Sequence, residues 1–430
     1  MLMFALLTNS SLYNKVYHNT RYCEVNYPFA RVYVNITTTE EVDMRLLVPT
    51  NWDTELIRPL SQIKADVQIF GVLPTSMMGS GMVGPDITQM PTKQAEKYIK
   101  LAHSAGLSFN YLLNAPCMNN MEWEEDTHRE LLQHLEWLSN CGVDCVTVAI
   151  PYLLELIKNQ FPCLKVEVST IAHVNSVARA KLFESLGADS IILDSNANRD
   201  FRLLKAIRNA VACELSILTN SLCLYQCPYE YYHNNTLGHA TQNHNPLGGF
   251  YMDYCVLHCA SNRLSDTSQF IKSRWIRPED IHVYEEIGID FFKIGGRAMP
   301  TEWIINATEA YSSRHYQGNL YDILSVLTPK IREVKPPLSS AEITTITSPP
   351  KVYIDNQSLE GFIDFFDKQD CPSGCAHCRY CQEIADKAVK LDSGEVNKYV
   401  GRLKSSLGDI ASGAWQSRLS EIASGFHPSQ

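Results

Sequence analysis

Short apolar runs rich in Val, Ile and Leu alternate with longer amphipathic stretches from about Met44 onward. This alternation is typical of βα units around a parallel sheet, whose strands are buried on both faces. Intervening segments such as 130–139 and 177–186 place apolar residues at helical spacing. We therefore predict an α/β fold, a closed (β/α)8 TIM-like barrel over residues 44–315. Its eight strands are expected at 45–48, 67–72, 108–113, 145–150, 165–169, 190–194, 213–218 and 290–294.

The seventh connection breaks this pattern, because residues 220–277 form one long segment with four cysteines and many Asn, His and Tyr. A connection of that length inside a compact domain is usually functional or disordered. The helix that closes the unit is expected at 278–287, with Pro278 in its first turn.

Regions outside the barrel are predicted from composition. Residues 327–352 mix Pro, Ser, Thr and Lys without periodicity and are predicted to form a linker. Residues 353–430 are predicted to form a small, helical, cysteine-rich C-terminal domain, and residues 1–43 an N-terminal extension packed on the barrel.

The number of cysteines becomes informative once the cellular compartment of the protein is considered. Of 430 residues, 45% are hydrophobic and 20% charged, and no apolar run has the length that crosses a bilayer. Met1–Leu7 lack a preceding cationic stretch and a cleavage site, so we expect no export signal and a cytoplasmic protein. Disulfides do not persist in a reducing cytosol, and the fourteen cysteines therefore favour metal binding.

Charge and missing motifs narrow the function classes. The formal net charge of −10 disfavours non-specific attraction to nucleic acid. A local basic face could still be formed by Lys272, Arg274 and Arg277, or by Arg202, Lys205 and Arg208. The sequence contains no HExxH, GxSxG or GxxxxGK[ST] motif, so these three hydrolytic and nucleotide-binding signatures are missing.

Two groups of cysteines are the main candidates for metal ligands. Two pairs, each separated by three residues, lie in the long connection: Cys223, Cys227, Cys255 and Cys259. Sets of four thiolates select iron-sulfur clusters or zinc, and the alternative is four incidental thiols.

The denser terminal group consists of Cys371, Cys375, Cys378 and Cys381. Its first three members match the CxxxCxxC spacing of radical S-adenosylmethionine enzymes, but that motif follows a barrel's first strand, and here it follows the whole barrel. We therefore predict an auxiliary or electron-transfer cluster there, with a structural zinc site as the alternative.

Polar residues just after the predicted strands are candidates for the active site, because barrel chemistry sits at the carboxyl ends of the strands. Lys293 and Arg297 are predicted to anchor an anionic donor, and the alternative is a structural ion pair that closes the barrel. His239 in the cysteine-bearing connection is a candidate for proton transfer. Further candidates are Asn114 and Asp194 for catalysis, and Ser169 and Asn175 for binding a cofactor.

Several segments match the motifs of a known family in the correct order. Residues 45–49 read RLLVP, residues 65–71 read ADVQIFG, and residues 292–297 read FKIGGR after the two cysteine pairs. Together they resemble peptidase family U32, the collagenase-like peptidases, which also contains oxygen-independent hydroxylases of transfer RNA, ribosomal RNA and the ubiquinone ring.

The resemblance implies a barrel, a four-iron, four-sulfur cluster held by Cys223, Cys227, Cys255 and Cys259, and prephenate as the oxygen source of the hydroxylases. The sequence departs from the family at Gly295, where a glutamate is usual, and at Ile171, where a glutamine is usual. A site that lacks these groups cannot pair with the same substrate, so RNA, ubiquinone and protein are not carried over as substrates.

These features predict an iron-sulfur-dependent oxidoreductase that hydroxylates a small molecule or peptide without oxygen gas. The terminal group is expected to pass electrons, supplied by an electron-donor protein or a paired family member. The alternatives are an unconventional metal-dependent peptidase and a non-catalytic, cluster-bearing partner subunit.

Overall fold

The computed structural model describes residues 44–73, 77–81, 90–244, 253–329, 349–368, 371, 375 and 377–413. The chain divides into two compact units, Met1–Val42 and Asp43–Gln430, and every described residue lies in the second. The N-terminal extension predicted at 1–43 lies outside the described residues, as do most of the predicted linker and residues 414–430.

Eight parallel strands close into one barrel in sequence order, which confirms the predicted fold class. The barrel closes where β1 pairs with β8, with Arg45 opposite Phe291. Each predicted strand is present, with ends shifted by at most two residues. The strands are β1 Arg45–Pro49, β2 Asp66–Gly71, β3 Ser108–Leu113, β4 Cys145–Val148, β5 Lys165–Val168, β6 Ser190–Ile192, β7 Glu214–Leu218 and β8 Phe291–Lys293.

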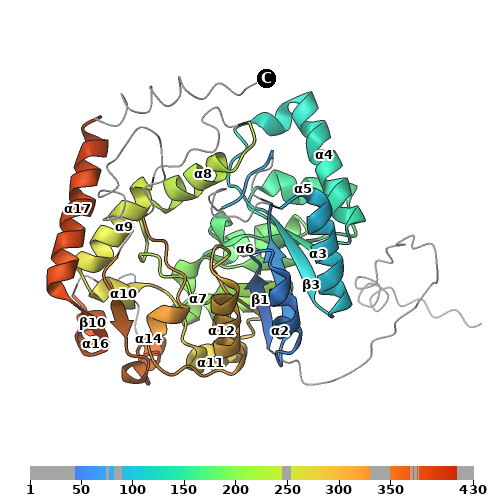
Figure 1. Cartoon of the computed structure of the whole chain (residues 1–430). Helices are drawn as coiled ribbons and strands as arrows, with labels where there is room; N and C mark the ends of the chain where they lie inside the picture. The colour runs from blue at the N-terminus through green and yellow to red at the C-terminus, as the bar shows by residue number, and fades with distance from the viewer. Residues whose placement is uncertain are drawn as a thin grey trace, which may run out of the picture. The chain divides into compact units, whose positions relative to one another are not determined.

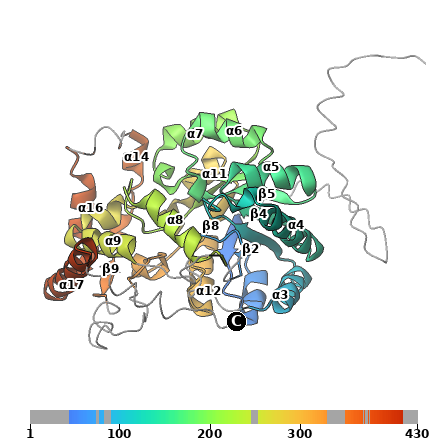
Figure 2. The same cartoon turned by 90° about the horizontal axis from the view of Figure 1, so that it is seen from above.

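Helices surround the strands, as the view from above shows (Figure 2). Local signals fix their starts: Pro151 occupies the first turn of α5, and the Asp200 carboxylate accepts a hydrogen bond from the Leu203 N–H at the start of α7. These helices are α2 Ile57–Ser61, α3 Thr92–Ser104, α4 Glu125–Asn140, α5 Pro151–Gln160, α6 Val177–Ser185, α7 Phe201–Ala210, α11 Ile281–Ile287 and α12 Thr301–Ser312.

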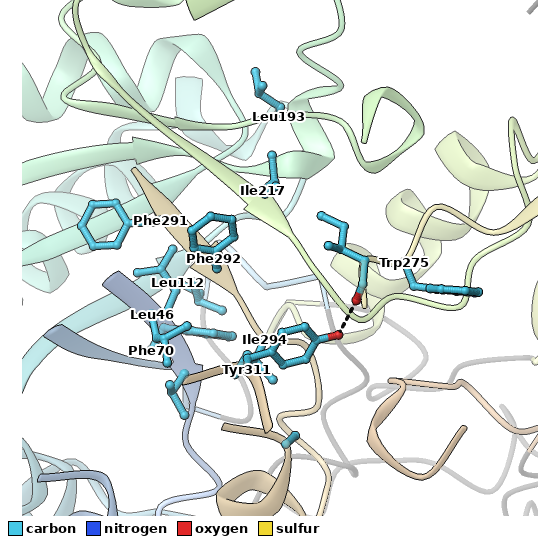
Figure 3. Packing of buried hydrophobic residues seen from close by; sticks show 14 of the residues in the cluster. Leu46, Phe70, Leu112, Leu193, Ile217, Trp275, Phe291, Phe292, Ile294 and Tyr311 are labelled. Carbon is cyan, nitrogen blue, oxygen red and sulfur yellow. Dashed lines mark hydrogen bonds between the residues drawn. The ribbon is translucent and has the colours of Figure 1, made fainter. Parts of the chain in front are cut away.

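The core contains large apolar side chains from strands and helices (Figure 3). Leu46, Phe70 and Phe292 are at most 2% exposed. Tyr311 on α12 is fully buried and donates a hydrogen bond to the carbonyl of Ile276 across 2.8 Å, which satisfies its hydroxyl inside this core.

The β7–β8 connection is largely helical where it is described, rather than an irregular loop. It contains α8 Glu230–Ala240, α9 Tyr254–Ser265 and α10 Ser268–Lys272. The predicted closing helix is present as a 3₁₀ turn, Pro278–Asp280, that leads into α11.

The terminal segment packs on this connection (Figure 1). Its elements are α14 Asp364–Lys368, α16 Tyr380–Ala388, α17 Ser393–Ala411, and an antiparallel pair of strands, β9 Val352–Ile354 and β10 Val389–Leu391. Helix α17 contacts α9, and α16 contacts α10. Helix α16, which carries Cys381, therefore lies beside the connection that carries the loop cysteines. Among helices of the described residues, none has the length and apolar character needed to cross a membrane.

Candidate functional site

The four loop cysteines come from two places in the β7–β8 connection. Cys223 and Cys227 follow β7, whereas Cys255 and Cys259 lie four residues apart on α9. Residues at this spacing lie on the same face of a helix, so both α9 sulfurs point to one side. All four cysteines are free thiols.

Electrostatic interactions between thiols link the two pairs of cysteines. Desolvation and then the neighbouring Cys227 and Cys259 raise the pKa of Cys255 to about 12. Desolvation and then Cys259 raise the pKa of Cys223 to about 12; this residue keeps exposed surface, but protein atoms surround its sulfur. Cys259 also contributes to the raised pKa of Cys227, after desolvation. Cys259 therefore lies near each of the other three.

Two of these sulfurs accept hydrogen bonds from side chains. Arg263 donates from Nη1 to Cys259 Sγ across 3.3 Å, and the Ser221 hydroxyl donates to Cys223 Sγ across 3.2 Å. Such donors stabilise negative charge on sulfur.

The predicted polar candidates at the strand ends form two contacting pairs. Asn114 after β3 donates to the Ser169 hydroxyl after β5 across 3.2 Å. Asn175 donates to Asp194 Oδ2 across 3.3 Å. Because these residues come from different strands, the barrel rim brings together what the sequence separates.

Asp194 belongs to a group that sequence reasoning did not select. His173 Nδ1 lies 3.3 Å from Asp194 Oδ2 and 3.8 Å from Glu230 Oε1. In the described residues, these three form the one set of His, Cys, Asp or Glu ligand atoms that all lie within 4.8 Å of one another. His173 is 4% exposed and Asp194 3%. The signals that could have found this group are a histidine and an aspartate after consecutive strands, and a glutamate three residues after Cys227.

The two carboxyl groups of this set titrate in opposite directions. Burial opposes ionisation of Asp194, but hydrogen bonds from His173 and Asn196 outweigh it and lower the carboxyl pKa. Desolvation and then the charge of Asp194 raise the pKa of Glu230. A cation or a proton beside Glu230 would relieve this repulsion.

Lys293 and Arg297 differ in their surroundings. Lys293 lies 3.5 Å from Glu167 inside the barrel, so its charge already has a partner. Arg297 Nη2 donates to the Gly81 carbonyl across 3.2 Å, whereas its buried Nη1 has no hydrogen-bond partner among the described residues. Burial lowers the pKa of Arg297 to about 10, which leaves it cationic at neutral pH.

His239 lies near the end of α8, and its Nδ1 is 3.0 Å from Gln242 Oε1. Gln242 in turn donates to the carbonyl of Cys117 across 2.7 Å. This histidine is thus tied to the loop after β3.

Of the terminal cysteines, Cys381 lies in α16, and the other three precede that helix. Desolvation raises the pKa of Cys381; Arg199 and Arg274 act against this rise, and Cys371 and Cys375 add to it. Cys375 and Cys378 are both exposed. The electrostatic interactions of Cys381 thus include two of the other three predicted ligands.

Comparisons with known proteins agree with the family resemblance. A model of peptidase family U32 matches residues 87–317. Over 300 residues the chain is 33% identical to an uncharacterized protease of Methanocaldococcus jannaschii, which covers 69% of this chain and 81% of that protein. A solved U32 peptidase structure is 24% identical, with a TM-score of 0.44, over 61% of this chain and 97% of the other. The chain belongs to peptidase family U32.

Proposed function

We propose that the chain is an iron-sulfur-dependent oxidoreductase whose reaction is the oxygen-independent hydroxylation of a small molecule or peptide. The convergence of Cys223, Cys227 and Cys255 on Cys259 carries this proposal. Four thiolates are the ligand set of a four-iron, four-sulfur cluster.

The spacing of the sulfurs favours a cluster over a single zinc ion. Thiolates around one zinc, at a Zn–S distance of about 2.3 Å, lie about 3.8 Å from one another. Among the described cysteines, no three sulfurs lie within 4.8 Å of one another. A cluster is larger than an ion, so the wider spread suits it. The hydrogen bonds from Arg263 and Ser221 would stabilise the cluster's thiolate ligands.

When bound, the cluster would supply electron transfer and a site for an oxygen-bearing donor, for which the family's hydroxylases suggest prephenate. Arg297 suits the carboxylate of such a donor, because its buried Nη1 lacks an acceptor among the described residues. Lys293 is held by Glu167 and would position the end of β8 instead of binding the donor.

His173 is the proposed proton acceptor. With Nδ1–H directed at Asp194, the imidazole presents Nε2 as its basic nitrogen, 3.5 Å from the Asn234 amide nitrogen. Glu230 lies beside His173 and begins α8 three residues after Cys227. The proposed proton acceptor would thus lie next to the cysteine-bearing segment.

Anaerobic purification tests the cluster directly. The proposal expects brown protein with about four iron and four sulfide per loop site. Cys255→Ala should remove that iron together with prephenate-dependent hydroxylation, whereas Cys213→Ala, outside both cysteine groups, should keep both. Colourless protein with one zinc per loop site would refute the cluster.

A metal-dependent peptidase is the second candidate. It is favoured by the family, by the name of the M. jannaschii relative, and by the set of His173, Asp194 and Glu230. Imidazole and carboxylate groups are zinc ligands, and three protein ligands would leave a fourth position for an activated water.

The same kinds of variant distinguish the peptidase from the oxidoreductase. Peptide hydrolysis by a zinc site should fall at least 100-fold in Glu230→Gln and after chelation, yet survive Cys255→Ala. Hydrolysis that withstands complete chelation, or that disappears only with the loop cysteines, would rule out this zinc site.

A further inference from the structure

A cavity of about 260 Å³ lies between the two cysteine groups. Tyr225 and Gln226, from the segment between Cys223 and Cys227, line one part, and Cys371 of the terminal group lines another. Asn175 and Asn196 add the barrel rim. Its volume is that of a site for a small ligand.

The lining is strongly cationic. Among the described lining residues are Arg199, Arg202 and Arg274, and the one carboxylate among them, Asp200, caps α7. Because α7 begins at this wall, the partial positive charge of the helix N-terminus adds to that of the arginines.

Arg274 is the residue that points to a ligand. It is 8% exposed, and in the described part of the chain its guanidinium makes no hydrogen bond or ion pair. Its contacts there are with aromatic rings, 3.8 Å over Tyr225 and 5.8 Å from Phe366. A buried charge without a partner is costly, and a bound anion removes that cost.

Arg199, which lies beside Arg274, is also a cation and cannot neutralise its charge, and its side chain makes other contacts. Arg199 donates to the carbonyls of Ile271 and Trp275 and packs over the Trp275 ring at 4.6 Å. Desolvation and then the charge of Arg274 lower the pKa of Arg199 to about 10. Positive charge is therefore concentrated at this cavity. The basic surface predicted at Lys272, Arg274 and Arg277 is not formed, because Arg274 and Arg277 are buried.

We propose that this cavity binds a small anion through a carboxylate or phosphate group, with Arg274 as its principal ligand. The planar guanidinium pairs such groups bidentately, and Tyr225 holds it in place by stacking. The site is separate from Arg297 at the end of β8. Its lining includes Cys371 of the terminal group, but the ligand contact proposed here is that of Arg274.

The test uses the full-length protein as purified, titrated with inorganic phosphate or with malonate, and with potassium chloride at equal ionic strength. Thermal unfolding should shift upward with phosphate, malonate or both, and the two anions distinguish the phosphate from the carboxylate form of the site. An equal shift with chloride, or none with either anion, would overturn the proposal.

The Arg274→Met variant tests the proposal through the direction in which its melting temperature changes. Without anion, the variant should melt at or above the temperature of the natural protein, because an unpaired buried charge is gone, and the anion-dependent shift should disappear. A variant that melts lower and keeps the shift would make Arg274 merely structural and refute the site. Arg129→Gln, on the exposed face of α4, is the matched control and should change neither value.

Should Arg274→Met fail to fold, Arg274→Lys keeps the charge but loses the planar fork. Its affinity for the active anion should fall at least tenfold in a calorimetric titration. Unchanged affinity would refute the assignment of Arg274.

Discussion

The ammonium nitrogen of Lys293 lies 3.5 Å from Glu167 Oε2 in the interior of the barrel. The same carboxylate accepts hydrogen bonds from Asn110 across 3.1 Å and from Thr147 across 2.9 Å. Lys293 also lies 4.2 Å over the ring of Phe70. Four strands thus contribute polar side chains to one buried group, and a fifth adds the ring of Phe70, where such barrels usually hold branched apolar side chains.

Breaking this ion pair should destabilise the barrel. Lys293→Met leaves the Glu167 carboxylate buried without its cation, and we expect a loss of about 3–5 kcal/mol in the free energy of unfolding. The double variant Lys293→Met, Glu167→Gln should recover more than half of that loss, because no uncompensated charge remains. Urea denaturation measures both, and equal losses in the single and double variants would contradict the ion-pair account.

The pKa values of the loop thiols predict how the metal-free protein responds to alkali. Burial raises the pKa of Cys255 from 9.0 to about 12. A pKa that is higher in the folded state gives stability that is complete below pH 9 and is lost as the pH rises toward 12. The free energy of unfolding should therefore decline less steeply across this range in Cys255→Ala than in the natural protein, by about 1 kcal/mol per pH unit. Cys375→Ala, at an exposed cysteine, is the control and should leave the slope unchanged.

Acid should act through a different residue, His134 on α4. Burial lowers its pKa to about 4, and its ring packs against Tyr111 and Trp137 with centroid distances of 5.6 and 5.3 Å. A lowered pKa means that the unfolded chain binds the proton first, so stability falls as the pH drops from 6.5 toward 4.

His134→Phe should remove up to about 3 kcal/mol of this acid-dependent loss, because phenylalanine fills the site without taking up a proton. Chemical denaturation at pH 7 and pH 4.5 provides the comparison. The exposed His315→Phe is the control, and a His134→Phe variant with the same acid dependence as the natural protein would contradict the assignment.

The strands could be predicted because each is a short apolar run whose burial does not depend on distant residues. For the same reason, Asn114, Ser169, Asn175 and Asp194 could be placed at the rim, since parallel strands end on one side of a barrel. Only the structure shows which of these residues contact one another.

The grouping of His173, Asp194 and Glu230 could not be predicted from the ends of the strands. Glu230 comes from the first turn of α8, and only the helical course of the β7–β8 connection brings it to His173. The sequence of that connection lacks clear periodicity, because α8 is polar on most sides and α9 is buried on most sides. The burial of Arg274 likewise depends on the terminal segment, since Phe366 packs beside it.

Gly296 provides the last prediction, because its backbone holds the end of β8 in a conformation with φ of 127°. A Cβ at this position would also clash with the ring of Trp303 on α12. Gly296→Ala should therefore lose about 2–4 kcal/mol in the free energy of unfolding. Since Arg297 follows directly, the variant should also weaken binding of an anionic donor there. Gly401→Ala is the matched control: it lies in α17 with open space around it and should gain about 0.5–1 kcal/mol. Thermal and urea unfolding of both variants check the sign of each change, and a stable Gly296→Ala would show that Trp303 can move aside and that the β8 end tolerates a side chain.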